Sequence, residues 1–170
     1  MPPRSRGSPT PTPTPSQANT PRVVNRSRPP GTIIPELPCA DVLRAAEWLC
    51  RAFGFRERLR IGTHRVQLTF GEGSVVVTER PADPRGSAPE GDARPGAAAG
   101  SGHRVLVAVG DVDAHFDRAR ECGARIIAPP ADHSYGERQY VAEDPDGHRW
   151  TFSQTIADVD PAAWGGTLVE

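Results

Sequence analysis

The side chains that could carry chemistry in this chain are few and scattered. Its five histidines lie far apart in the sequence, at His64, His103, His115, His133 and His148. No Ser-His-Asp arrangement, phosphate-binding loop or dinucleotide-binding motif accompanies them. The three cysteines, Cys39, Cys50 and Cys122, form no Cys-x-x-Cys pair. We interpret them as packed, reduced thiols of a cytoplasmic protein, with a catalytic thiolate as the alternative.

The most informative segment is a predicted hairpin near the end of the chain. Asp-Pro-Asp-Gly at 144–147 separates two runs in which apolar residues alternate, 135–143 and 148–154. Proline presets the first turn position and glycine accepts a positive φ, so the pattern predicts a tight turn between two strands. Gly-Glu-Gly at 71–73 separates the runs 66–70 and 74–78 in the same way. A hairpin that recurs within one chain indicates a duplicated unit.

The segments upstream of the two hairpins repeat as well. A short apolar run at 33–37 precedes Asp41, a candidate N-cap, and helical spacing then continues to Phe53 before Gly54. In the second half the run is 105–109, the candidate cap is Asp111 and the helix stops at Gly123. His115 falls on this second helix, where we expect it to be solvated. Short strands at 55–60 and 125–128 follow, so the predicted order is strand, helix and three strands, twice.

A paired strand-helix-three-strand module with Asp-Pro-Asp-Gly-His before its last strand resembles the vicinal oxygen chelate superfamily. The phrase Tyr-Gly-Glu-Arg-Gln-Tyr at 135–140, followed by Asp-Pro-Asp-Gly-His-Arg-Trp at 144–150, is typical of its glyoxalase and bleomycin-resistance-like branch. The resemblance implies an α+β fold in which two βαβββ modules form a curved, eight-stranded mixed sheet around a cavity, with the helices outside.

Relatives of this kind that depend on a metal hold it with four ligands, and the matching positions here read Ile34, Val77, His103 and Thr151. Valine and isoleucine side chains offer no donor to a transition metal, so we expect a protein without a metal cofactor. The alternative is a divalent metal held by His103 with Glu79 and His64.

The resemblance predicts a cavity with polar and apolar walls. If Thr151 faces inward, Arg149 and Ser153 do so too, while Trp150 and Phe152 face the helices. Val75 and Val77 would line the other half, and Tyr135 would stack on a ligand at the cavity edge. Arg149 either binds an anionic group of a small organic ligand or pairs with Glu143 or Asp146. His103 is either an acid-base group or a hydrogen-bonded wall residue. Glu137 and Arg138 are expected to pair with each other at the surface.

Composition narrows the function classes. The net charge is −1, all twenty basic residues are Arg, and five of them lie within 1–32 without an acid. The body therefore carries net negative charge, which argues against nucleic-acid binding. No apolar run is long enough for a membrane span or a secretion signal. We expect a metal-free small-molecule-binding protein, with a glyoxalase-like lyase or isomerase as the alternative, so whether it is an enzyme stays open.

The predicted boundaries divide the chain into five parts. A Pro-, Thr- and Arg-rich tail, 1–31, is expected to be disordered. The first module spans 32–80, a Pro-, Gly- and Ala-rich linker 81–102, the second module 103–154 and a C-terminal extension 155–170. Because cavities in the resembled family are often completed by a second chain, we expect a homodimer.

Overall fold

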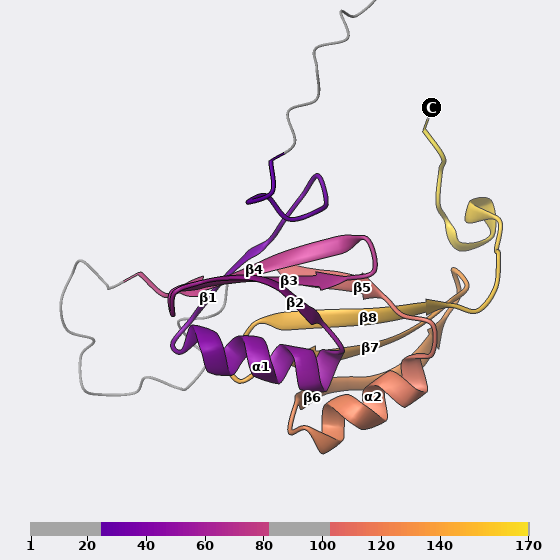
Figure 1. The fold of residues 1–170 in the computed structure, drawn as a ribbon. Helices are drawn as coiled ribbons and strands as arrows, with labels where there is room; N and C mark the ends of the chain where they lie inside the picture. Colours follow the sequence, from indigo (N-terminus) through magenta and orange to yellow (C-terminus); the bar gives the residue numbers. More distant parts are fainter. Residues whose placement is uncertain (1–24, 82–102, 170) are drawn as a thin grey trace, which may run out of the picture.

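A computed structural model describes residues 25–81 and 103–169 of the chain. Most of the predicted tail and nearly all of the predicted linker lie outside these residues. The first module contains β1 (Glu36–Cys39), α1 (Val42–Phe53), β2 (Arg56–Ile61), β3 (Arg65–Phe70) and β4 (Gly73–Glu79). The second contains β5 (Arg104–Ala108), α2 (Val112–Glu121), β6 (Arg125–His133), β7 (Glu137–Glu143) and β8 (Arg149–Thr155), followed by the short 3-10 helix η1 (Pro161–Trp164). The predicted α+β class is confirmed (Figure 1).

The strands form two mixed sheets of four, which are not closed into one continuous sheet. Their orders are β1-β4-β3-β2 and β5-β8-β7-β6, so the same topology occurs twice. The first strand of each module runs parallel to the last, and the remaining neighbours are antiparallel. A helix connects each parallel pair, as parallel strands require.

The predicted caps fix where the helices begin and end. Asp41 accepts a hydrogen bond from the backbone N–H of Arg44, and Asp111 accepts one from Ala114. Gly54 ends α1 in the left-handed region, with φ of 76°. None of the described helices is long and apolar enough to cross a membrane.

Alternation along the strands gives each sheet a core face and an open face. On β8, Trp150 and Phe152 are completely buried in the hydrophobic core. On β4, Val75 and Val77 lie in the same core. We call the opposite surfaces, which face away from the helices, the open faces of the first and second sheets.

Both modules share one core. Phe53, at the end of α1, packs against Trp150 and Phe152 of the second module, with ring centroids 5.4 and 4.7 Å away. His115 of α2 lies within this contact and is 6% exposed, so the expectation that it is solvated is wrong. Its Nδ1 lies 2.6 Å from the Tyr140 hydroxyl and its Nε2 lies 3.1 Å from the carbonyl oxygen of Phe53. A carbonyl only accepts, so Nε2 carries the proton.

The Asp-Pro-Asp-Gly-His turn connects β7 to β8 and also contacts the first module. Asp144 accepts hydrogen bonds from the backbone N–H groups of Asp146 and His148 and from the indole of Trp150. Asp146 in turn accepts a hydrogen bond from the backbone N–H of Ala40 at 2.9 Å. The turn therefore both shapes its own hairpin and joins the two modules.

Residues 25–31, which the sequence assigns to a disordered tail, lie on the open face of the first sheet (Figure 1). Gln67 of β3 donates to the carbonyl oxygen of Ser27 at 2.6 Å and is 2% exposed. Arg58 of β2 donates to the carbonyl oxygen of Arg26 at 3.0 Å. The segment was missed because it has no periodic apolar pattern and is held through backbone carbonyls.

Candidate functional site

The open face of the second sheet has a polar floor. Thr151 and Ser153 of β8 are 8% and 7% exposed and point away from the core, as predicted from their register. The Ser153 hydroxyl donates to Oε2 of Glu137 at 2.5 Å, and the Gln139 amide donates to the same oxygen at 2.6 Å. These three side chains come from β7 and β8, which are paired along their whole length. The floor therefore carries one carboxylate held by neutral donors.

Arginines gather at the opposite end of this face. Arg149 on β8 is the backbone partner of Arg104 on β5, so the two side chains start next to each other. Nε of Arg149 lies 3.7 Å from Glu143, too far for a hydrogen bond, and its side chain is 51% exposed. Glu143 makes its closer contact, at 2.8 Å, with Arg125. Two guanidinium groups thus contact one carboxylate, and Arg104 adds a third arginine beside Arg149, which leaves positive charge at this end.

Aromatic rings border the end that carries Glu137. Tyr135 lies in the loop before β7 and donates to Oε1 of Gln139 at 3.3 Å. Its ring stacks on His133, with centroids 5.0 Å apart, and lies 5.9 Å from the edge-on ring of Trp164 in η1. The C-terminal extension is tied to this loop because Ile156 and Ala157 both donate to the carbonyl oxygen of Gly136. A Cβ on Gly136 would lie 2.1 Å from the Ala157 oxygen, so this approach requires glycine.

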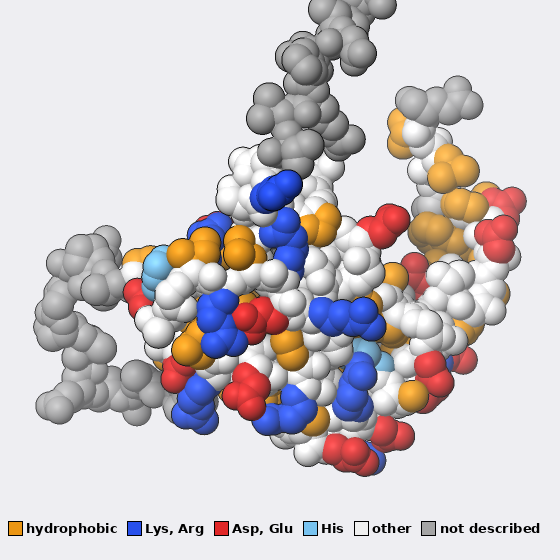
Figure 2. Space-filling view, in the orientation of Figure 1, with side chains coloured by type: hydrophobic (Ala, Val, Ile, Leu, Met, Phe, Trp, Pro, Cys, Tyr) orange, Lys and Arg blue, Asp and Glu red, His pale blue; other side chains and the backbone are white. Residues whose placement is uncertain are grey.

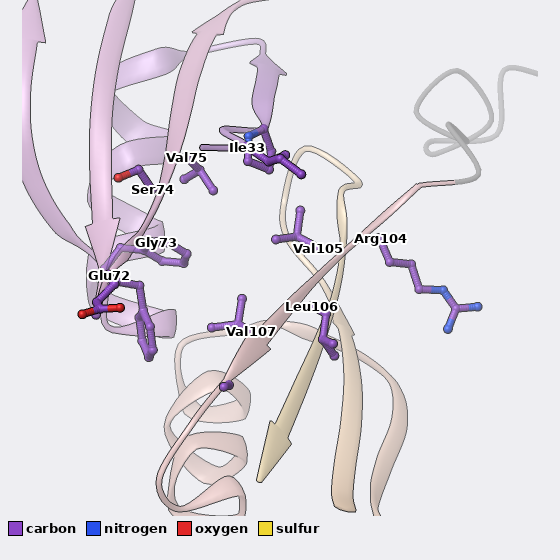
Figure 3. A pocket seen from close by; sticks show the side chains of 14 residues that line it. Ile33, Glu72, Gly73, Ser74, Val75, Arg104, Val105, Leu106 and Val107 are labelled. Carbon is purple, nitrogen blue, oxygen red and sulfur yellow. The ribbon is translucent and has the colours of Figure 1, made fainter. Parts of the chain in front are cut away.

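A cavity of about 610 Å³ lies between the two modules. Figure 3 shows Ile33, Val75, Val105 and Val107 pointing toward one another across it, whereas the charged ends of Glu72 and Arg104 point away. Phe55 and Phe70 complete its apolar lining. The cavity can hold apolar surface but supplies little polar recognition.

The positions that match the ligands of metal-dependent relatives do not form a metal site here. Val77 lies in the core with none of its surface exposed and does not line the cavity, whereas Val75, which also belongs to the core, does line the cavity between the two modules. The β3–β4 turn occupies 71–72, so Gly73 already belongs to β4, whereas the β7–β8 turn occupies 144–148 and Gly147 lies before β8. The fourth residue after the glycine is therefore Val77 on the core face in the first module, but Thr151 on the open face in the second. Ser74, Val76 and Thr78 are the open-face residues of β4.

The alternative metal set does not assemble either. His103 precedes β5 and is exposed, His64 lies in the β2–β3 turn, and Glu79 is exposed at the end of β4. Within 25–81 and 103–169, no three His, Cys, Asp or Glu side chains are placed to hold a metal ion. The donor set on these residues therefore does not match a transition-metal site.

The predicted surface pair between Glu137 and Arg138 is wrong. Arg138 binds Asp113 and Asp132, at 2.9 and 2.7 Å, and not the neighbouring Glu137, because successive residues of a strand face opposite sides. Glu137 consequently belongs to the open face. Gln139 is not among the site residues predicted from the sequence, although alternation from buried Tyr140 places it on the open face. Trp164 of the C-terminal extension docks beside Tyr135, a contact that nothing in the sequence specifies.

Comparison with known proteins agrees with this architecture. Residues 33–152 match the family model of the Glyoxalase/Bleomycin resistance protein/Dioxygenase superfamily, and the chain belongs to that family. TioX from Micromonospora sp. ML1 is 36% identical, with a TM-score of 0.56, over 76% of this chain and 100% of TioX. A glyoxalase/bleomycin resistance protein/dioxygenase from Nocardioides shares the fold at 18% identity, with a TM-score of 0.56, over 84% of this chain and 91% of its own.

Curated relatives match over a shorter stretch. An uncharacterized protein of Mycobacterium tuberculosis H37Rv is 38% identical over 56 residues, which is 33% of each chain. The match therefore spans about a third of that relative's length.

Proposed function

We propose that this protein binds a small organic molecule on the open face of its second sheet, without a metal, in the manner of a sequestering protein. One observation supports this most: Thr151, Ser153 and Gln139 form a floor of neutral hydrogen-bonding groups between charged ends. Hydroxyl and amide groups recognise ligand atoms but do not transfer protons near neutral pH. The one carboxylate of the floor, Glu137, already accepts hydrogen bonds from Ser153 and Gln139 through Oε2, so the floor as a whole favours binding over catalysis.

Arg149 and Arg104 supply the proposed contact with an anionic group of the ligand. The long Arg149–Glu143 contact leaves the guanidinium N–H groups of Arg149 able to bind a carboxylate or phosphate in a paired geometry. Tyr135 would close the far end of the same face. The apolar cavity lies on the core side of β5, the edge strand of this sheet, and would accept a hydrophobic part of a ligand that passes over that edge.

A second copy of the chain is the proposed cover for the apolar side chains that remain exposed on the open faces. Leu106 is 64% exposed on the open face of β5, next to Thr151. Ile127 and Ile61 are also exposed on β6 and β2. In Figure 2 hydrophobic side chains lie along the upper edge of the body, below the N-terminal segment. A homodimer would bury these groups and complete two equivalent sites. We place the protein in the cytoplasm, where its three free cysteines stay reduced.

The test is a thermal-shift screen of anionic and neutral aromatic small molecules, repeated with Arg149→Ala. A bound acid should lose about 1–2 kcal/mol of binding free energy in the variant, because the half-exposed guanidinium is less desolvated than a buried partner. The melting temperature without ligand should barely change. Arg51→Ala, which removes an exposed arginine from α1, is the matched control.

Elemental analysis separates this function from a metal-dependent one. The purified protein should hold no stoichiometric transition metal, and chelator treatment should leave ligand binding unchanged. About one metal per chain, lost together with binding in His103→Ala or Glu79→Ala, would replace the proposal with metal-dependent chemistry.

A further inference from the structure

The carboxylate of Glu137 lies on the open face of the second sheet without a positively charged partner among the described residues. Among the described residues it forms no ion pair, and its only hydrogen bonds, from Ser153 and Gln139, both reach Oε2. The other acid of this face, Glu143, is paired with Arg125 and Arg149. A half-buried carboxylate beside neutral donors keeps its negative charge uncompensated, and its second oxygen remains an available acceptor.

The rings next to this carboxylate suit the same type of ligand group. Tyr135 is joined to Glu137 through Gln139, and Trp164 lies against Tyr135 with 42% of its surface exposed. Aromatic faces attract organic cations, and tryptophan does so most strongly. A carboxylate and an aromatic wall in one corner therefore favour an ammonium group and disfavour an anion.

We propose that Glu137, Ser153, Gln139, Tyr135 and Trp164, the Glu137 corner, bind a positively charged amine of the ligand. This inference rests on the proposed function and specifies its ligand class. The corner and Arg149 lie at the two ends of β8's open face. Arg149 and Ser153 are four residues apart along β8, which corresponds to about 13 Å. A ligand that reaches both ends is zwitterionic, with its amine at Glu137 and its acid at Arg149.

The experiment titrates the full-length protein, labelled with ¹⁵N, with two indole probes of opposite charge. Tryptamine carries the cation and indole-3-propionate the anion. Tryptamine should shift the resonances of Ser153, the Gln139 amide and the Trp164 indole N–H. Glu137→Gln keeps the shape and removes the charge, and it should weaken tryptamine binding about ten- to a hundredfold. Trp164→Ala should weaken it severalfold.

Glu143→Gln is the matched control, because it neutralises the other carboxylate of the same face. It should leave tryptamine affinity unchanged. Indole-3-propionate should bind at the arginine end, depend on Arg149 and ignore Glu137→Gln. Should Glu137→Gln not fold, Trp164→Ala still tests the corner, because Trp164 lies outside the core.

The possible failures are distinguishable. If indole-3-propionate binds through Arg149 but tryptamine binding does not change in Glu137→Gln or Trp164→Ala, the ammonium site is refuted and the proposed function stands. If neither probe shifts any open-face resonance, both are refuted. Equal weakening of tryptamine by Glu143→Gln would reduce the effect to general surface charge and also overturn the proposal.

Discussion

His148 lies in the β7–β8 turn, where its Nδ1 is 3.0 Å from the carboxylate of Asp144. Burial alone would lower the pKa of His148. The hydrogen bond to Asp144, the charges of Asp144 and Asp146 and the backbone carbonyl of Pro38 outweigh burial and raise that pKa. His115 has the opposite balance, since burial lowers its pKa to about 4. In His148 the neighbouring carboxylates thus outweigh burial, whereas in His115 burial in an aromatic core dominates.

These shifts predict how stability depends on pH. Because its pKa is raised in the folded state, His148 contributes its full stabilisation of the fold below its unfolded pKa, about 6.5. That contribution is lost as the pH rises through the pKa of His148 in the folded state. His115 has the opposite effect. Below about pH 6.5 its imidazole gains a proton in the unfolded state, whereas in the folded state it stays neutral down to about pH 4. His115 therefore lowers the free energy of unfolding as the pH falls. Urea unfolding of the wild type and His148→Gln between pH 6 and 8 measures the first effect. The stability difference between the two proteins should shrink as pH rises; a constant difference would show that His148 does not contribute through its charge.

At the scale of elements, segment 25–31 covers the open face of the first sheet. Both ends of the Gln67 amide are satisfied there, because Nε2 donates to Ser27 and Oε1 accepts from Arg58 at 2.5 Å. Val76, at 1% exposure, lies on the same face and shares a cavity lining with Ser27 and Pro29. The two modules therefore differ: this chain occupies the open face of its first sheet itself, whereas that of the second carries the candidate site.

Removing the segment should lower stability without preventing folding. A chain beginning at residue 32 loses the Gln67 and Arg58 hydrogen bonds and should be about 1–2 kcal/mol less stable than one beginning at residue 25. Thermal melts and urea unfolding measure this. Gln67→Leu, introduced into both the longer and the shorter chain, completes a double-mutant cycle. It should destabilise the longer chain and cost little in the shorter one, where the amide has no segment to bind. Equal costs in both chains would mean that the segment does not dock.

At the scale of the whole molecule, the exposed apolar residues on the open faces bear on assembly. Leu106→Glu places a charge on the proposed contact between copies and should shift the protein from dimer to monomer in sedimentation or light scattering. Arg51→Glu introduces the same acid on the exposed side of α1 and should leave the dimer intact. A wild-type chain that is monomeric at concentrations well above those of the ligand assays would contradict the proposed shared site.

The sequence by itself determined the duplicated module, its helix caps and its turns, because these depend on local spacing and on Asp41, Asp111, Gly54 and the Asp-Pro-Asp-Gly turn. The sequence also placed Thr151 on the open face, because side chains alternate along a strand and the facing of one residue fixes that of the others. Tertiary structure decided what local pattern leaves open. Turn length set the facing of Val77, packing of both helices into one core buried His115, and the C-terminal extension brought Trp164 to Tyr135. Contacts between residues that are distant in the sequence leave no periodic pattern in it, so only the folded chain shows the Glu137 corner.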